Sequence, residues 1–273
     1  MMKFQEAMIY DLQKASLTKR ISAFLFDLVT LAVIFTGCML LISTICGYDG
    51  KTQALSDRMT EIHEDFGIAE LEKEHSVTFN DFQYMTEEER AKLPESLVST
   101  FNAYNDALTQ DTKIIFLYET VFTLSLMIVS LSLLAAFLVV DFAVPLYFKN
   151  GQTLGKKIFG IAVMQTDGVK LPVKTLFIRT VLGKYTIGAM VPALMLLSLL
   201  FGGSPIMPLT VILAILLIQV VMLITTKTNS LIHDTLSATV VVDFQSQMIF
   251  ESAKDKEEYV LRIHRENAEK ADY

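Results

Sequence analysis

Cysteine is scarce in this 273-residue sequence, which contains only Cys38 and Cys46. Both residues lie in one long apolar stretch, and on a single helix their separation is too large for a disulfide bond. The two cysteines therefore give no information about the redox compartment in which the protein resides.

Charged residues are almost absent from four apolar stretches, although they make up 19% of the chain. About 20 residues cross a ~30 Å hydrocarbon core as a helix, so uncharged stretches of this kind predict transmembrane helices. We expect an all-α membrane protein with four transmembrane helices, at residues 21–46, 114–148, 186–201 and 207–226. Four such stretches in one short chain argue against core helices of a soluble domain. The third is short, which leaves a tilted or re-entrant element open.

Residues 1–20 lack the pattern of a cleavable signal peptide, because they are polar and of mixed charge and the apolar stretch that follows is too long. We expect the first span to remain in the mature protein. Apolar residues near helical spacing favour an amphipathic segment on the cytoplasmic surface, and a plain polar extension fits equally well. These residues are Phe4, Met8, Ile9 and Leu12.

Positive charge is concentrated in two segments outside the spans, although the formal net charge of the chain is −7. Residues 1–20 carry four basic and two acidic residues, and residues 149–185 carry seven basic residues and a single acidic one. Residues 47–113 are strongly acidic instead. Because Lys and Arg near spans stay on the cytoplasmic side, we expect both termini in the cytoplasm of a multi-pass cell-membrane protein.

The acidic segment 47–113 has the periodicity of a folded helical insert outside the membrane. Thr86 and Glu89 form a capping-box pattern at the start of one helix, which Pro94 should end or kink. We expect further amphipathic helices around residues 55–66 and 97–108, the last of which could run directly into the second span. That span, at 35 residues, is longer than the bilayer core and is expected to extend outward past Glu119.

The basic segment 149–185 and the final segment 227–273 predict a small cytoplasmic β element. Residues 160–165 and 237–244 are rich in β-branched residues, and Asp167-Gly168 is a turn signal that could return the chain as a hairpin strand at 169–171. Residues 172–185 have the pattern of a basic amphipathic helix suited to anionic lipid headgroups. The charged tail after residue 251 is expected to be a solvated helix.

Two aspartates, Asp27 and Asp141, lie inside predicted spans, where a charge costs about 2.5–3.5 kcal/mol. With opposite helix directions, both lie about 9–10 Å from the cytoplasmic boundary, so they could face each other. Arg20 is two turns before Asp27 and could pair with a carboxylate or extend to the lipid headgroups. This trio suits an ion or proton site, and it suits equally well a structural pin that holds the helices together.

Three patterns that would suggest other chemistry are weak. Gly151-Gln-Thr-Leu-Gly155-Lys156-Lys157 lacks the spacing and the hydroxyl residue of a phosphate loop, and its lysines read better as inner-side anchors. His63 and His75 match no metal-ligand spacing, and His233-Asp234 has no partner nucleophile. We therefore expect no catalytic site, no metal, no cofactor and no nucleic-acid partner, and we do not expect an enzyme.

The order of several motifs resembles the RDD family of bacterial membrane proteins. The resemblance rests on Arg20 and Asp27 in the first span and Asp141 in the second. It continues through an inner-side loop motif of Gly151, Gly155, Lys156, Gly160, Arg179, His233 and Asp234. The acidic insert is longer than is usual in that family, and Ser237-Ala238 departs slightly from its pattern.

The resemblance implies transport of an ion or small solute, with cation/proton exchange suggested for some family members. The alternative is a non-transporting scaffold or accessory protein that binds a partner through its outer insert. Four helices form a small pathway, so transport would favour a homo-oligomer. The bilayer itself and anionic headgroups at the basic loop are the other expected partners.

Overall fold

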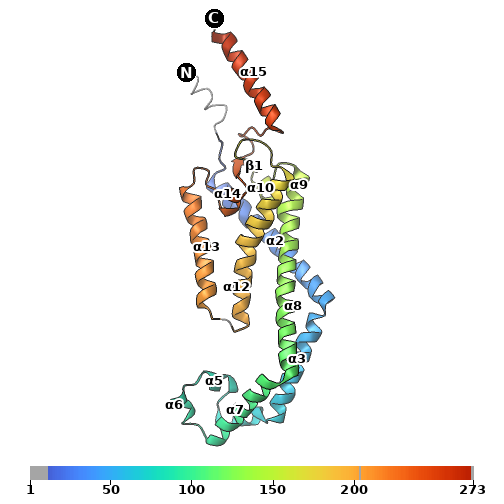
Figure 1. Cartoon of the computed structure of the whole chain (residues 1–273), viewed down its shortest axis with the longest axis vertical. Helices are drawn as coiled ribbons and strands as arrows, with labels where there is room; N and C mark the ends of the chain where they lie inside the picture. Colours follow the sequence, from blue (N-terminus) through green and yellow to red (C-terminus); the bar gives the residue numbers. More distant parts are fainter. Residues whose placement is uncertain (1–11, 203, 272–273) are drawn as a thin grey trace. The chain divides into compact units, whose positions relative to one another are not determined.

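The computed structural model describes residues 12–202 and 204–271, and these are mostly helical with one small sheet (Figure 1). The expected N-terminal amphipathic segment falls largely on residues 1–11, outside the described residues. The chain divides into two compact units, which are described separately. The membrane unit comprises Met1–Met39 and Val129–Tyr273, and the insert unit comprises Leu40–Ile128.

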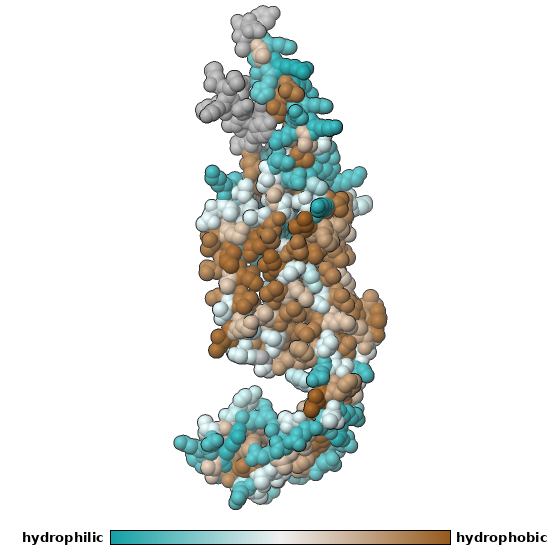
Figure 2. Space-filling model, viewed as in Figure 1, coloured by the Kyte–Doolittle hydropathy of each residue, from teal (hydrophilic) through white to brown (hydrophobic). Residues whose placement is uncertain are grey.

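Four helical segments are long and apolar enough to cross a membrane, which confirms the predicted architecture. They are Leu17–Cys46, Thr112–Phe148, Val173–Leu200 and Ile206–Thr225. Large apolar side chains such as Leu213 and Ile224 are 70% and 74% exposed, and apolar residues cover the visible face of these helices (Figure 2). Surface of this kind is stable only against lipid or another apolar partner.

The second and third segments each contain a π-helical stretch. The second consists of α8 (Thr112–Phe137), η1 (Leu138–Ala143) and α9 (Val144–Phe148). The third consists of α11 (Val173–Phe177), η2 (Ile178–Met190) and α12 (Val191–Leu200). π-Helices are rare and occur mostly as single turns, frequently at functional sites, so these stretches mark where such a site would be sought.

The third segment differs from the sequence-based expectation. We expected an interfacial helix over residues 172–185 followed by a short span at 186–201, but one continuous helical segment begins at Val173. The basic residues of this region include Arg179, which is buried in the membrane unit rather than directed to headgroups. The segment α12 lies beside α13 (Ile206–Thr225), the fourth span (Figure 1).

A two-stranded antiparallel sheet and two short helices lie at one end of these spans (Figure 1). Strand β1 (Ile161–Gln165) pairs with β2 (Thr239–Asp243), so the predicted strands are present. Short helices precede each strand, α10 (Leu154–Ile158) and α14 (Ile232–Leu236). The expected hairpin return at 169–171 is reduced to isolated bridges: Lys170 bridges to Met164, and its backbone N–H donates to the carbonyl oxygen of Phe250. The predicted tail helix is α15 (Ala253–Ala271).

The insert unit has its own helical core. Helices α3 (Tyr48–Asp65), α4 (Ile68–His75), α5 (Phe79–Tyr84), α6 (Glu87–Arg90) and α7 (Glu95–Gln110) build it. Phe101, Leu97 and Ile68 are fully buried at its centre. The Thr86–Glu89 capping box is present as predicted. Helix α7 does not run directly into α8, because Asp111 between them is extended and ends α7.

Candidate functional site

Asp27 of α2 (Leu17–Cys46) is bound at the start of α10, which carries Gly155 and Lys156 of the inner-side loop motif. Its Oδ1 accepts a hydrogen bond of 2.8 Å from the backbone N–H of Gly155, and its Oδ2 accepts one from the Thr153 hydroxyl. Glycine is required here, because a Cβ at position 155 would lie 2.3 Å from the carbonyl oxygen of Ala23. Asp27 therefore anchors Gly155 and Thr153 to the first span.

Asp141 lies on η1 and pairs with Lys184 on η2, so the two π-helical stretches meet at an ion pair. The Thr180 hydroxyl also donates to the backbone carbonyl of Asp141 at 2.8 Å. Asp141 is only 6% exposed, and its partner Lys184 was not singled out in the sequence. The buried charge of the second span is thus compensated by the third span.

Asp234 on α14 collects the largest set of polar partners. It accepts hydrogen bonds from Arg179 and from the backbone N–H of Leu231, the latter at 3.2 Å. Arg20 Nη2 lies 3.5 Å from Asp234 Oδ2, and the same guanidinium donates to the carbonyl oxygen of Asn229 at 2.7 Å. Burial, the largest single influence, would raise the pKa of Asp234, but the nearby charges, that of Arg179 first, and the hydrogen bonds from Leu231 and Arg179 together outweigh it and hold this pKa far below its ordinary value.

Arg20 pairs with a carboxylate, which is one of the two outcomes that the sequence left open. Arg20 faces Asp234, which lies 214 residues further along the chain, and not the aspartate two turns later on its own helix. Arg20 and Arg179 thereby share one carboxylate between the first and third spans. A local-spacing argument cannot find such a partner, because it compares only neighbours on one helix.

His233 of α14 packs against η2 as a neutral imidazole. Gly183 of η2 allows this approach, because a Cβ there would lie 2.4 Å from the Cβ of His233. Burial lowers the pKa of His233 to about 3, although the nearby charge of Asp234 acts in the opposite direction. Its Nε2 lies 3.5 Å from Asp234 Oδ1. His233 therefore packs against η2 directly beside Asp234.

Lys156 is buried beside Asp27, which overturns its expected role as a headgroup anchor. Its side chain is 9% exposed, its Nζ donates to the Thr153 hydroxyl at 3.3 Å, and the Nζ lies 4.0 Å from Asp27 Oδ2. Burial, together with the charges of Lys184 and Arg179, lowers the pKa of Lys156 to about 7. The neighbouring Lys157 does lie at the surface, over the ring of Phe148.

The remaining glycines of the loop motif shape its turns. Gly151 has φ +61°, and a Cβ there would lie 2.9 Å from the carbonyl oxygen of Val163 on β1. Gly160, with φ +65°, directly precedes β1. Both positions explain why the loop needs glycine without any phosphate ligand.

These residues form a charge cluster at one end of the spans. We define the cluster as Arg20, Asp27, Asp141, Lys156, Arg179, Lys184, His233 and Asp234. It contains four basic side chains, three carboxylates and one histidine. Asp27 lies near Lys156, and Asp141 pairs with Lys184. The negative charges of both carboxylates favour the protonated form of Lys156. In residues 12–202 and 204–271, no group of three or more His, Cys, Asp or Glu side chains is placed to hold a metal ion.

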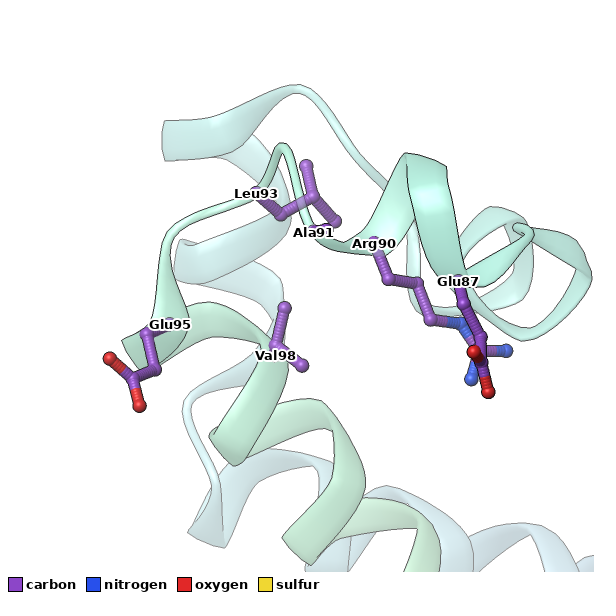
Figure 3. Close-up of a pocket in the computed structure, with 6 residues that line it drawn as sticks. All are labelled: Glu87, Arg90, Ala91, Leu93, Glu95 and Val98. Carbon is purple, nitrogen blue, oxygen red and sulfur yellow. The ribbon is translucent and has the colours of Figure 1, made fainter.

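A hollow of about 360 Å³ lies in the insert unit, lined by residues of α6, α7 and the turn between them (Figure 3). Leu93 and Val98 give it an apolar floor, and Glu87, Arg90 and Glu95 stand around it. The hollow is open to solvent and contains no side chain of the charge cluster. It is a surface feature of a different unit.

Comparison with known proteins gives one family match. Residues 14–238 match the family model described as the RDD family, and this range covers every member of the charge cluster. No curated protein and no solved structure matches the chain. Because the match extends over most of the sequence and both π-helical stretches, the chain belongs to the RDD family.

Proposed function

We propose that this RDD family membrane protein transports an ion or a small solute across the bacterial cell membrane, with protons as a coupling ion in a cation/proton exchange. The observation that carries the proposal is the charge cluster, in which eight ionisable groups are held at the ends of three spans and two adjoining helices. No catalytic step is assigned to it.

The physical argument concerns the free energy cost of burying charged groups. Replacing a buried ion pair by packed apolar residues is often neutral or stabilising, so stability alone does not require such a cluster. Charged groups in spans are costly, and they mark ion pathways and proton relays, so a functional site is the default hypothesis for them. The Asp141–Lys184 pair also joins two π-helical stretches, and these weaken the helix ladder where a change of packing would be needed.

We further propose that both termini and the charge cluster face the cytoplasm. Lys149, Lys157 and Lys174 remain exposed around the cluster and are available to anionic headgroups. Because four spans make a small pathway, we include a homo-oligomer in the proposal. A single cysteine placed at the exposed Asp167-Gly168 turn should react with an impermeant thiol reagent only after the cells are opened.

A non-transporting accessory role is the second candidate, and the hollow of the insert unit favours it (Figure 3). An apolar surface bordered by charged side chains suits contact with a partner protein. In that case the charge cluster only holds the helices together, and its neutral variants would leave solute flux unaffected.

Flux in proteoliposomes separates the two candidates. The purified chain is reconstituted with a pH gradient, and uptake is measured for several cations. Asp141→Asn should reduce flux at least tenfold, and Asp27→Asn should do the same where its loop stays folded. Asp243→Asn, whose partner Lys19 lies outside the cluster, is the matched control and should keep its flux. Unchanged flux in both cluster variants, or none in the unaltered protein, would refute transport through the cluster.

A further inference from the structure

The charge cluster has one positive charge more than it has negative charges. Its carboxylates are Asp27, Asp141 and Asp234, and its basic groups are Arg20, Lys156, Arg179 and Lys184. Because His233 is neutral, four cationic groups face three anions when every lysine is protonated. A buried surplus charge is unfavourable, and this favours the loss of a proton from one of the basic groups.

The contacts of the four basic groups are unequal. Arg179 and Lys184 each donate directly to a carboxylate, and Arg20 donates to a carbonyl oxygen besides lying near Asp234. Guanidinium groups do not lose a proton in proteins, which leaves the two lysines. Lys184 has a direct ion pair with Asp141, whereas Lys156 Nζ lies 4.0 Å from its nearest carboxylate oxygen, beyond hydrogen-bonding distance.

The surroundings of Lys156 are mixed in charge. Lys184 and Arg179 on η2 repel its proton, and Asp141 on η1 and Asp27 on α2 attract it. Thr153 accepts its hydrogen bond, and His233 on α14 is also near enough to feel its charge. Among the described residues, Nζ donates to no other acceptor. Loss of the proton would therefore break no hydrogen bond to a carboxylate and would remove only the 4.0 Å charge contact with Asp27.

We propose that Lys156 is the group at which the cluster takes up and releases a proton. This inference rests on the proposed transport function for its biological use, but the titration itself is independent of it. The step is Lys–NH₃⁺ giving Lys–NH₂ and one proton to water, with the electron pair left on Nζ. The neutral amine keeps its hydrogen bond to Thr153, and the cluster then carries three positive and three negative charges.

The two protonation states differ in the balance of charge around Asp27. When Lys156 is protonated, its charge lies 4.0 Å from Oδ2 of Asp27, and when it is neutral this carboxylate keeps only hydrogen-bond donors. The neutral state therefore leaves a buried carboxylate that attracts positive charge. This coupling would link one proton released to one positive charge admitted.

The test is a direct titration of lysine side chains in the full-length protein. The protein is labelled with lysine carrying ¹³C at Cε, placed in lipid nanodiscs, and followed by NMR from pH 5 to 10. We expect one lysine resonance to titrate with a midpoint near 7, where burial places the pKa of Lys156. The resonance should be absent from Lys156→Gln and present in Lys157→Gln, a control at an exposed neighbouring position.

Two results would overturn the inference. They are the absence of any lysine that titrates between pH 6 and 9, and a titrating resonance that persists in Lys156→Gln. If that persisting resonance disappears in Lys184→Met, the titrating group is Lys184. A failure of flux in the unaltered protein would refute transport without changing these spectra. Where flux is present, Lys156→Arg, which cannot release its proton, should reduce proton-coupled flux at least tenfold.

Discussion

The backbone N–H of Gly155 donates to Oδ1 of Asp27 at 2.8 Å, and this contact ties the inner loop to the first span. Gly155→Ala should destabilise the membrane unit, because its Cβ would lie 2.3 Å from the carbonyl oxygen of Ala23. Forced overpacking of this kind costs about 1–3 kcal/mol. Thermal unfolding in detergent measures the loss of stability.

Gly37→Ala, where no atom lies within 4 Å of the new Cβ, is the control and should be at least as stable as the unaltered protein. Equal unfolding temperatures for the two variants would contradict the prediction.

Removal of the Asp234 charge should be far more damaging than removal of the Asp243 charge. Asp234→Asn leaves the buried Arg179 without its carboxylate, and breaking such a pair costs about 3–5 kcal/mol. Asp243→Asn breaks a pair with the partly exposed Lys19, which is worth about 0–1 kcal/mol. Urea unfolding of both variants, followed by the fluorescence of an attached dye, compares them. A similar loss in both would show that Arg179 finds another partner.

The spans and the sheet were predictable because their signals are local. A stretch without charge, such as residues 207–226, has to be solvated by lipid wherever the rest of the chain lies. The same holds for the β-branched residues 239–242 and for the Thr86–Glu89 capping box, which depend on neighbours within a few positions. Asp27 and Asp141 were found for the same reason, since each is a charge in an apolar stretch.

The partners of these charges were not predictable. Whether Lys184 faces headgroups or Asp141 depends on the rotation of the third segment, and η2 shifts that rotation away from the regular helical period. Lys156 carried the same ambiguity, because its burial results from the fit of α10 against the first span. A lone basic residue in a loop is normally solvated, so only the fold reveals this inward lysine.

The stability of the insert unit should fall at acidic pH through Asp111. Hydrogen bonds from Arg58 and from the backbone N–H of Ile114 lower the pKa of Asp111 below its ordinary value of 3.8. The stabilisation is therefore fully present above pH 3.8 and is lost as the pH falls through the lowered value. Hydrogen exchange of the amides in the first turn of α8 should accelerate in that window.

Asp111→Asn tests this assignment, because the amide cannot titrate. The variant should exchange faster than the unaltered protein at neutral pH and show little further change in acid. Asp106→Asn on the neighbouring helix α7 is the control and should keep the acid response of the unaltered protein. Persistence of the full response in Asp111→Asn would assign it to another carboxylate.

The membrane unit should lose stability between pH 6.5 and about 3 because His233 is buried without a proton. Its pKa falls from an ordinary 6.5 to about 3 through burial, so in this window the unfolded chain binds a proton that the folded protein does not. Stability therefore rises with pH across the window and falls on acidification. His233→Phe keeps a ring of similar size and removes the titrating group. This variant should unfold at nearly the same temperature at pH 4.5 and pH 6.5. The unaltered protein and the exposed control His264→Gln should both unfold at a lower temperature at pH 4.5 than at pH 6.5. If His233→Phe shows the same fall in unfolding temperature at pH 4.5 as the unaltered protein, another group of the charge cluster is responsible for it.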